Sequence, residues 1–194
     1  MSDQDLDALM ARYGAGDESA FDALYRLLSP RLYAFCLRLT RRRTEADDLF
    51  QETFLKLHRS RATYQPRAAA IHWAFAVARS VYLDRLRFQR RRPEAVVETE
   101  EGLATFTSLP GIEGSPEEHA RARQLMTIVD RVLRDLPENQ RAAYVLLREE
   151  GLSVAEAAAV LGATPTAVKL RAFRAYEAIR GALQAAGITL PEER

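Results

Sequence analysis

Basic side chains near the C-terminal end of the chain have the types and the spacing to bind a nucleic acid. Lys169, Arg171 and Arg174 lie within six residues of one another. Lysine and arginine bind phosphate groups, and arginine can donate two hydrogen bonds to a guanine in the major groove. Leu170, between them, can contact the methyl group of a thymine. The residues that we expect on this duplex-binding surface are Thr164, Thr166, Lys169, Leu170, Arg171 and Arg174.

The residues around this segment predict how it is positioned. Ser153 followed by Glu156 has the pattern of a capping box, which starts a short helix of small apolar residues. Gly162 suits the left-handed position after that helix, and Thr164 with Pro165 suits the start of the next one. This order indicates a helix-turn-helix, whose second helix enters a major groove. The alternative is a helical hairpin whose charges only face solvent.

Apolar residues recur at helical spacing along most of the remaining chain. Three such stripes precede Pro93, and Pro137 suits the first turn of a helix that runs to Gly151. The predicted helices cover residues 24–39, 44–57, 69–92, 125–136 and 137–151. No stretch keeps the alternating pattern of a strand, so we expect an all-α protein.

The formal net charge of +1 conceals an uneven distribution of charge along the chain. Residues 1–92 carry a net charge of +6, residues 93–118 carry −7 without one basic side chain, and residues 119–194 carry +2. Prolines and glycines interrupt residues 93–118, which is typical of a linker. We therefore expect two helical domains, 1–92 and 119–194, joined by an acidic flexible linker across 93–118.

The composition and the scattered reactive residues exclude several classes of function. No apolar run approaches the ~20 residues of a membrane-spanning helix, and the acidic N-terminus lacks the apolar core of a signal peptide. The single cysteine, Cys36, lies in an apolar stretch, which favours a buried thiol over a redox sensor. His58, His72 and His119 lack the spacing of metal ligands, and no glycine-rich phosphate loop is present. We expect a cytoplasmic protein that is not an enzyme and holds no metal.

Four segments resemble those of extracytoplasmic-function sigma factors, the small promoter-recognition subunits of bacterial RNA polymerase. Residues 45–55 (EADDLFQETFL) resemble the family's D-A-E-D-L-V-Q-E-T-F-L helix, and residues 73–87 resemble its W-L-x-x-I-A-R-N-x-x-x-D-x-L-R segment. Residues 136–141 (LPENQR) resemble L-P-x-x-x-R, and residues 162–174 resemble G-x-S-x-G-T-V-K-S-R-L-x-R. The segments occur in the family's order, and the resemblance extends over residues 20–185.

The resemblance implies a role for each part of the chain. Residues 1–92 would form a sigma domain 2-like bundle that binds core polymerase and recognises and melts the −10 element. Residues 119–194 would form a sigma domain 4-like helix-turn-helix that reads the −35 duplex. The linker, 93–118, would lie in the positively charged cleft and RNA exit channel of polymerase, or alternatively serve only as a solvated connection.

The resemblance also implies a polymerase-binding face on the helix around residue 50. Carboxylates and an amide on one side of that helix would complement the basic coiled coil of the polymerase clamp. The residues implied are Asp47, Asp48, Gln51, Glu52 and Leu55. The local residues alone are equally consistent with an ordinary acidic start of a helix, which the helix dipole stabilises.

The implied contacts with the −10 element lie in one loop and the helix after it. The residues are Tyr64, Gln65, Arg67, Arg79, Ser80, Arg87, Arg90 and Arg91. The loop would hold a flipped base, while the arginines would follow the backbone of the single strand. Trp73 could stack on a base, but its spacing from Val77 favours a place in the core. Residues 41–43 (RRR) are consistent with either a DNA contact or a solvated turn.

The chain departs from the family's pattern at several positions. Ser80 stands where asparagine is usual, and Ala167 and Leu170 replace two residues that carry hydroxyl groups. Tyr176 replaces a basic residue. Because these changes remove hydroxyl groups and a positive charge, they predict weaker binding to duplex DNA.

The expected partners follow from the same resemblance. They are core RNA polymerase, through its clamp coiled coil and its flap, promoter DNA and an anti-sigma factor, with no cofactor and no membrane insertion. The main alternative is a homodimeric helix-turn-helix regulator that binds palindromic duplex DNA through residues 119–185. That alternative leaves residues 1–92 without a role.

Overall fold

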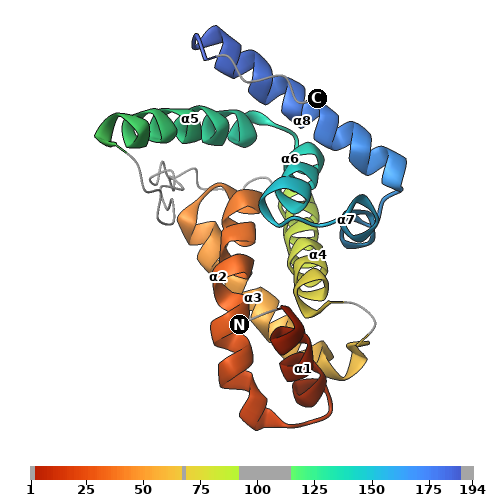
Figure 1. The fold of residues 1–194 in the computed structure, drawn as a ribbon. Helices are drawn as coiled ribbons and strands as arrows, with labels where there is room; N and C mark the ends of the chain where they lie inside the picture. The colour runs from red at the N-terminus through yellow and green to blue at the C-terminus, as the bar shows by residue number, and fades with distance from the viewer. Residues whose placement is uncertain (1–2, 67–68, 92–114, 189–194) are drawn as a thin grey trace.

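The computed structural model describes residues 3–66, 69–91 and 115–188. Within these ranges the regular structure consists of eight α-helices and a few short helical turns, and no strand is present. The expectation of an all-α protein is confirmed. The helices form two bodies, which we call the first body (residues 3–66 and 69–91) and the second body (residues 115–188) (Figure 1).

The first body is a bundle of four helices. They are α1 (Asp3–Gly14), α2 (Phe21–Thr40), α3 (Arg43–Ser60) and α4 (Ala70–Arg91). Leu32, Phe35, Leu49, Ile71 and Phe75 have no exposed surface and form the centre of its core. No stripe was named from the sequence for helix α1, although its Leu6, Met10 and Tyr13 follow helical spacing and are buried.

The second body contains the remaining helices. They are α5 (Pro116–Asp135), α6 (Glu138–Tyr144), the π-helical turn η4 (Val145–Glu149), α7 (Val154–Leu161) and α8 (Pro165–Ala185). Helix α5 begins inside the segment that we expected to be linker up to residue 118. Ser115 caps it through a reciprocal pair of hydrogen bonds with Glu118, and Pro116 occupies its first turn. The remaining linker residues up to 114 lie outside the described ranges.

The two bodies are in direct contact. Helix α7 lies against α4, and α6 lies against α2 (Figure 1). Buried apolar side chains from both bodies belong to one continuous cluster. Helices α4 and α7 each bury two or more alanines, including Ala74, Ala78, Ala157 and Ala158. Small side chains allow two helix backbones to approach closely, so alanine suits this contact.

Candidate functional site

The predicted helix-turn-helix is present in α7 and α8. The side chain of Ser153 accepts a hydrogen bond from the backbone of Glu156 at 3.3 Å, and the Glu156 carboxylate accepts one in return at 2.7 Å. Gly162 ends α7 in the left-handed conformation, with φ of 54°. The hydroxyl of Thr164 accepts a hydrogen bond from Ala167 N at 3.2 Å and so caps α8. Each local expectation for this motif is confirmed.

The turn glycine makes a testable contribution to stability. Gly162→Ala should destabilise the protein by about 1 kcal/mol, because a Cβ is strained at positive φ. Gly181→Ala is the matched control, since Gly181 lies inside α8, where an added Cβ would meet no atom within 4 Å and alanine favours a helix interior. Chemical denaturation should therefore show opposite changes in the free energy of unfolding. Equal effects of the two substitutions would contradict the assigned turn.

Helix α8 separates a buried stripe from an exposed, basic face. Val168, Ala172 and Ala175 are buried, while the predicted DNA-binding residues Lys169 and Arg174 are exposed. Of the other predicted residues, Arg171 is half-buried at the edge of this face, Leu170 is 49% exposed, and Thr164 and Thr166 are exposed. These residues do come together on one face of the N-terminal half of the helix.

The same face carries an aromatic residue that was not among the predicted DNA-binding residues. Phe173 is 58% exposed and lies three residues after Leu170, so the two side chains are neighbours on the helix surface. Basic side chains flank them at Lys169 and Arg174. An apolar pair between cations suits contact with thymine methyl groups in a negatively charged groove.

Tyr176, at a position where the family usually has a basic residue, takes part in packing. Its ring centroid lies 5.3 Å from that of Tyr144 on α6 in an edge-to-face arrangement. Burial raises the pKa of Tyr144 to about 12. Tyr176, which carries no charge, therefore helps to hold α8 against α6.

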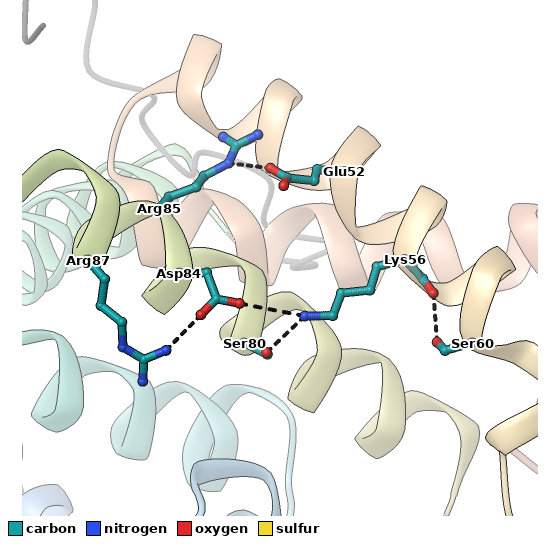
Figure 2. Close-up of polar contacts among 7 residues, drawn as sticks. All are labelled: Glu52, Lys56, Ser60, Ser80, Asp84, Arg85 and Arg87. Atoms are coloured by element: carbon teal, nitrogen blue, oxygen red, sulfur yellow. Dashed lines mark hydrogen bonds and ion pairs between the residues drawn. The ribbon is translucent and has the colours of Figure 1, made fainter.

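The predicted polymerase-binding residues lie on α3 and divide into two groups. Asp48, Gln51 and Leu55 are exposed, and Leu55 retains 56% of its surface. Their spacing of three and four residues places them along one face of the helix. The other two have partners in the same body. The hydroxyl of Tyr33 donates to Asp47 at 2.6 Å. Arg85 pairs with Glu52 at 2.6 Å, and Glu52 nevertheless stays exposed (Figure 2).

An aromatic cluster that was not predicted as functional adjoins this acidic helix. Tyr25 on α2 contacts Phe54 and Phe50 on α3, with ring centroids 4.8 Å and 6.2 Å apart, and it is 40% exposed. Phe50 and Phe54 are themselves 4.9 Å apart. Partly exposed aromatic rings beside acidic groups are frequent in the centres of protein interfaces.

A polar network crosses the surface between α3 and α4, as Figure 2 shows. The ammonium group of Lys56 donates to the hydroxyl of Ser80 at 3.0 Å and lies 3.7 Å from the carboxylate of Asp84. Asp84 also pairs with Arg87 at 2.7 Å. Lys56 therefore adds a cation, absent from the sequence predictions, beside the predicted DNA-binding residues Ser80 and Arg87.

The other predicted arginines on α4 differ in their environment. Arg79 is only 14% exposed, since it pairs with Glu138 at 3.1 Å and donates to the carbonyl oxygen of Leu161 at 3.1 Å. Arg90 and Arg91 are exposed at the end of the helix. Arg79 therefore faces the second body, whereas the arginines at the helix end face solvent.

The loop before α4 presents one of its predicted residues and buries another. Tyr64 is 8% exposed and its ring lies 5.4 Å from that of Trp73, so both rings help to pack the loop against the bundle. Burial also raises the pKa of Tyr64. Gln65 is exposed and remains accessible to a nucleic acid. Arg67 lies outside the described residues.

Other candidate chemistry is limited in the parts of the chain that the structure describes. Cys36 is fully buried, and burial raises the pKa of its thiol to about 12, as expected for a structural cysteine. No cluster of three or more histidine, cysteine, aspartate or glutamate residues there could hold a metal ion. None of the described helices has the length and the apolar character needed to span a membrane.

Comparisons with known proteins match two separate segments of the chain. The family model described as Sigma-70 region 2 matches residues 24–92, and the model described as Sigma-70, region 4 matches residues 126–179. The RNA polymerase sigma factor CarQ of Myxococcus xanthus is 34% identical over 88% of this chain and 93% of its own length. The ECF RNA polymerase sigma factor SigM of Mycobacterium tuberculosis is 34% identical over 86% of this chain and 79% of its own.

Two solved structures share the fold. The sigma factor RpoE from Bartonella quintana, in complex with the anti-sigma factor NepR, gives a TM-score of 0.64 at 22% identity and covers 84% of this chain and 96% of its own. CnrH in complex with the cytosolic domain of CnrY gives a TM-score of 0.65 at 24% identity, with 93% and 98% covered. At these identities the likeness concerns the fold.

Proposed function

This chain belongs to the extracytoplasmic-function sigma factors of RNA polymerase and directs promoter-specific transcription initiation, and we propose a division of labour between its two bodies. The first body binds the clamp coiled coil of core polymerase and holds the melted −10 strand. The second body reads the −35 duplex with α8 and contacts the polymerase flap. An anti-sigma factor restrains the protein.

One observation carries this proposal. The chain presents two different exposed faces. The one on α8 is basic and carries Lys169 and Arg174, and the one on α3 is acidic and carries Asp48 and Glu52. A basic helix after a tight turn suits a major groove. The acidic α3 face repels DNA and suits a basic protein surface instead. A homodimeric DNA-binding regulator would use only the first of these faces.

The proposal requires binding and no catalysis by this chain. Polymerase supplies the chemistry of RNA synthesis, and the sigma factor selects where synthesis begins. Because polymerase acts inside the cell, we propose a cytoplasmic location.

Transcription from genomic DNA tests the function directly. The protein is combined with core polymerase of its own organism, and the RNA products are sequenced from their 5′ ends. We expect defined start sites at a small set of promoters that share −10 and −35 sequences. Products that match those of core polymerase alone, which begin at DNA ends, would count against the proposal.

A further inference from the structure

A cleft of about 710 Å³ lies between one side of α4, the turn that joins α2 to α3, and the last turn of α5. Both bodies therefore contribute to its walls. Five arginines line it, and we call it the arginine cleft. They are Arg41 and Arg42 in the turn, Arg85 on α4, and Arg131 and Arg134 on α5.

Positive charge in the arginine cleft exceeds negative charge. Among the described residues that line it the carboxylates are Glu45 and Asp135, so five arginines against two carboxylates leave a net charge of +3. Like charges that are held close together repel one another. Burial, followed by the charge of Arg41, lowers the pKa of the nearby Arg141. An anion in the cleft would therefore stabilise this arrangement of arginines.

The arginines of the cleft retain donors for a ligand. Arg42 lies 3.6 Å from the carboxylate of Glu45, and Arg85 pairs with Glu52, which is outside the cleft. A guanidinium group has five N–H donors, so one such partner leaves others available. Arg131 is exposed, and its side chain makes neither an ion pair nor a hydrogen bond within the described part of the chain.

The backbone at Arg41 adopts a conformation that disfavours a side chain. Its φ is 68°, and no other residue except glycine has a positive φ in the ranges that the structure describes. A Cβ is strained at such an angle. The guanidinium group of Arg41 donates to the carbonyl oxygen of Arg134 and so reaches across the cleft. Backbone strain of this kind is frequent at functional sites, which fits a cation that serves a ligand here.

The size of the cleft and its remaining walls suit a nucleoside. A water molecule takes up about 30 Å³ in the liquid, so the cleft admits a ligand much larger than one phosphate group. Tyr82 and Leu86 offer apolar surface, and the amide of Gln89 can both donate and accept hydrogen bonds. Apolar contact and an amide suit the base of a nucleotide, whereas the arginines suit its phosphate groups.

We propose that the arginine cleft binds a nucleoside polyphosphate, whose phosphate groups pair with the arginines while its base contacts Tyr82, Leu86 and Gln89. For residues 41–43 the sequence left open a DNA contact or a solvated turn, and this assignment gives Arg41 and Arg42 a third role. The proposal goes beyond the proposed function and does not rest on it, because nucleotide binding is measured without polymerase and without DNA.

Isothermal titration calorimetry with the full-length protein tests the class of ligand. The ligands are ATP, GTP, inorganic triphosphate and adenosine, without divalent cations that would neutralise the phosphate groups. We expect one nucleotide to bind per protein molecule, about tenfold or more tightly than inorganic triphosphate and adenosine, since only a nucleotide has both kinds of contact. Inorganic triphosphate that binds as tightly as ATP and GTP would overturn the proposal. So would the absence of binding by both nucleotides at millimolar concentration.

Arg131→Ala locates the ligand within the protein. Because Arg131 is exposed, its removal should leave the fold intact and weaken nucleotide binding about tenfold through the loss of charge-assisted hydrogen bonds. Arg121→Ala is the matched control, since Arg121 is exposed on the same helix, lies outside the cleft and carries the same charge. This control should bind nucleotide as the wild type does. Equal affinities of the two variants would refute the assigned site.

Arg41→Gly separates the loss of ligand binding from a loss of folding. Glycine removes the backbone strain together with the cation, so the melting temperature should not fall while nucleotide binding weakens. The relieved strain offsets the lost hydrogen bond to Arg134. A folded Arg41→Gly variant that binds nucleotide as tightly as the wild type does would contradict the role of Arg41.

A competition experiment distinguishes a nucleotide from a nucleic acid, which the same cations could bind. A short fluorescent single-stranded oligonucleotide of mixed sequence is the probe, and ATP or GTP is the competitor. Displacement of the probe from the wild type, but not from Arg131→Ala, supports a nucleotide site. A probe that needs Arg131 for binding and that neither nucleotide displaces would make the cleft a nucleic-acid contact and the proposal wrong.

Discussion

Asp48→Lys combined with Gln51→Ala is expected to weaken binding to core polymerase about 10- to 100-fold, which corresponds to roughly 1.4–2.7 kcal/mol. Both residues are exposed on the face of α3 that also carries Leu55. A lysine there would face the basic coiled coil of the clamp, and juxtaposed like charges oppose binding. Titration of labelled protein with core polymerase measures the dissociation constant.

A matched control separates the local effect from a general change of charge. Glu177→Lys with Gln184→Ala makes the same change of net charge at exposed positions of α8, away from α3. This control should bind polymerase within about twofold of wild type. Helicity should be unchanged in both variants, since the substituted side chains are exposed. Equal affinities of the two double variants would refute the polymerase-binding role of α3.

Arg171→Ala is expected to weaken binding to promoter duplex by about 1–3 kcal/mol if the arginine makes a paired contact with a guanine. In that case the preference for one base at one −35 position should relax. If Arg171 contacts only phosphate, the loss should be uniform across sequences and the salt dependence should fall by about one ion. Fluorescence anisotropy with single-position variants of the −35 element at two salt concentrations distinguishes these results.

A control and a second template locate the effect within the protein. Arg180→Ala lies on the same helix, but Arg180 pairs with Glu177, and the variant should bind as wild type does.

On a template with a pre-melted −10 region, Arg171→Ala should still initiate, whereas Gln65→Ala should lose −10 preference. Tyr64 is unsuitable for this comparison because it is buried and its loss would disturb packing. The reverse pattern would exchange the roles assigned to the two bodies.

The ends of α7 and α8 could be predicted from the sequence, because interactions between residues close in the chain determine them. Ser153, Gly162 and Thr164 act through hydrogen bonds and backbone angles within a few residues, and each was found in its expected role. Apolar periodicity likewise located α2, α3 and α4, because a helix buries the same face whichever element covers it. The start of α5 was missed although it follows the same rule, since Ser115 and Glu118 form a capping box that was not considered.

Only the tertiary structure decided which of the predicted site residues remain accessible. The spacing of Tyr64 and Gln65 gave no indication that one ring would pack against Trp73 while its neighbour stayed exposed. Arg79 is 59 residues from Glu138, and Arg38 is 92 residues from Asp130. A sequence shows the charges of such residues but not their partners, because long-range pairing depends on how whole helices pack. The sequence by itself therefore determined the helices and the types of side chain that they present. Helix packing determined that arginines of the first body, Arg38 and Arg79, pair with carboxylates of the second.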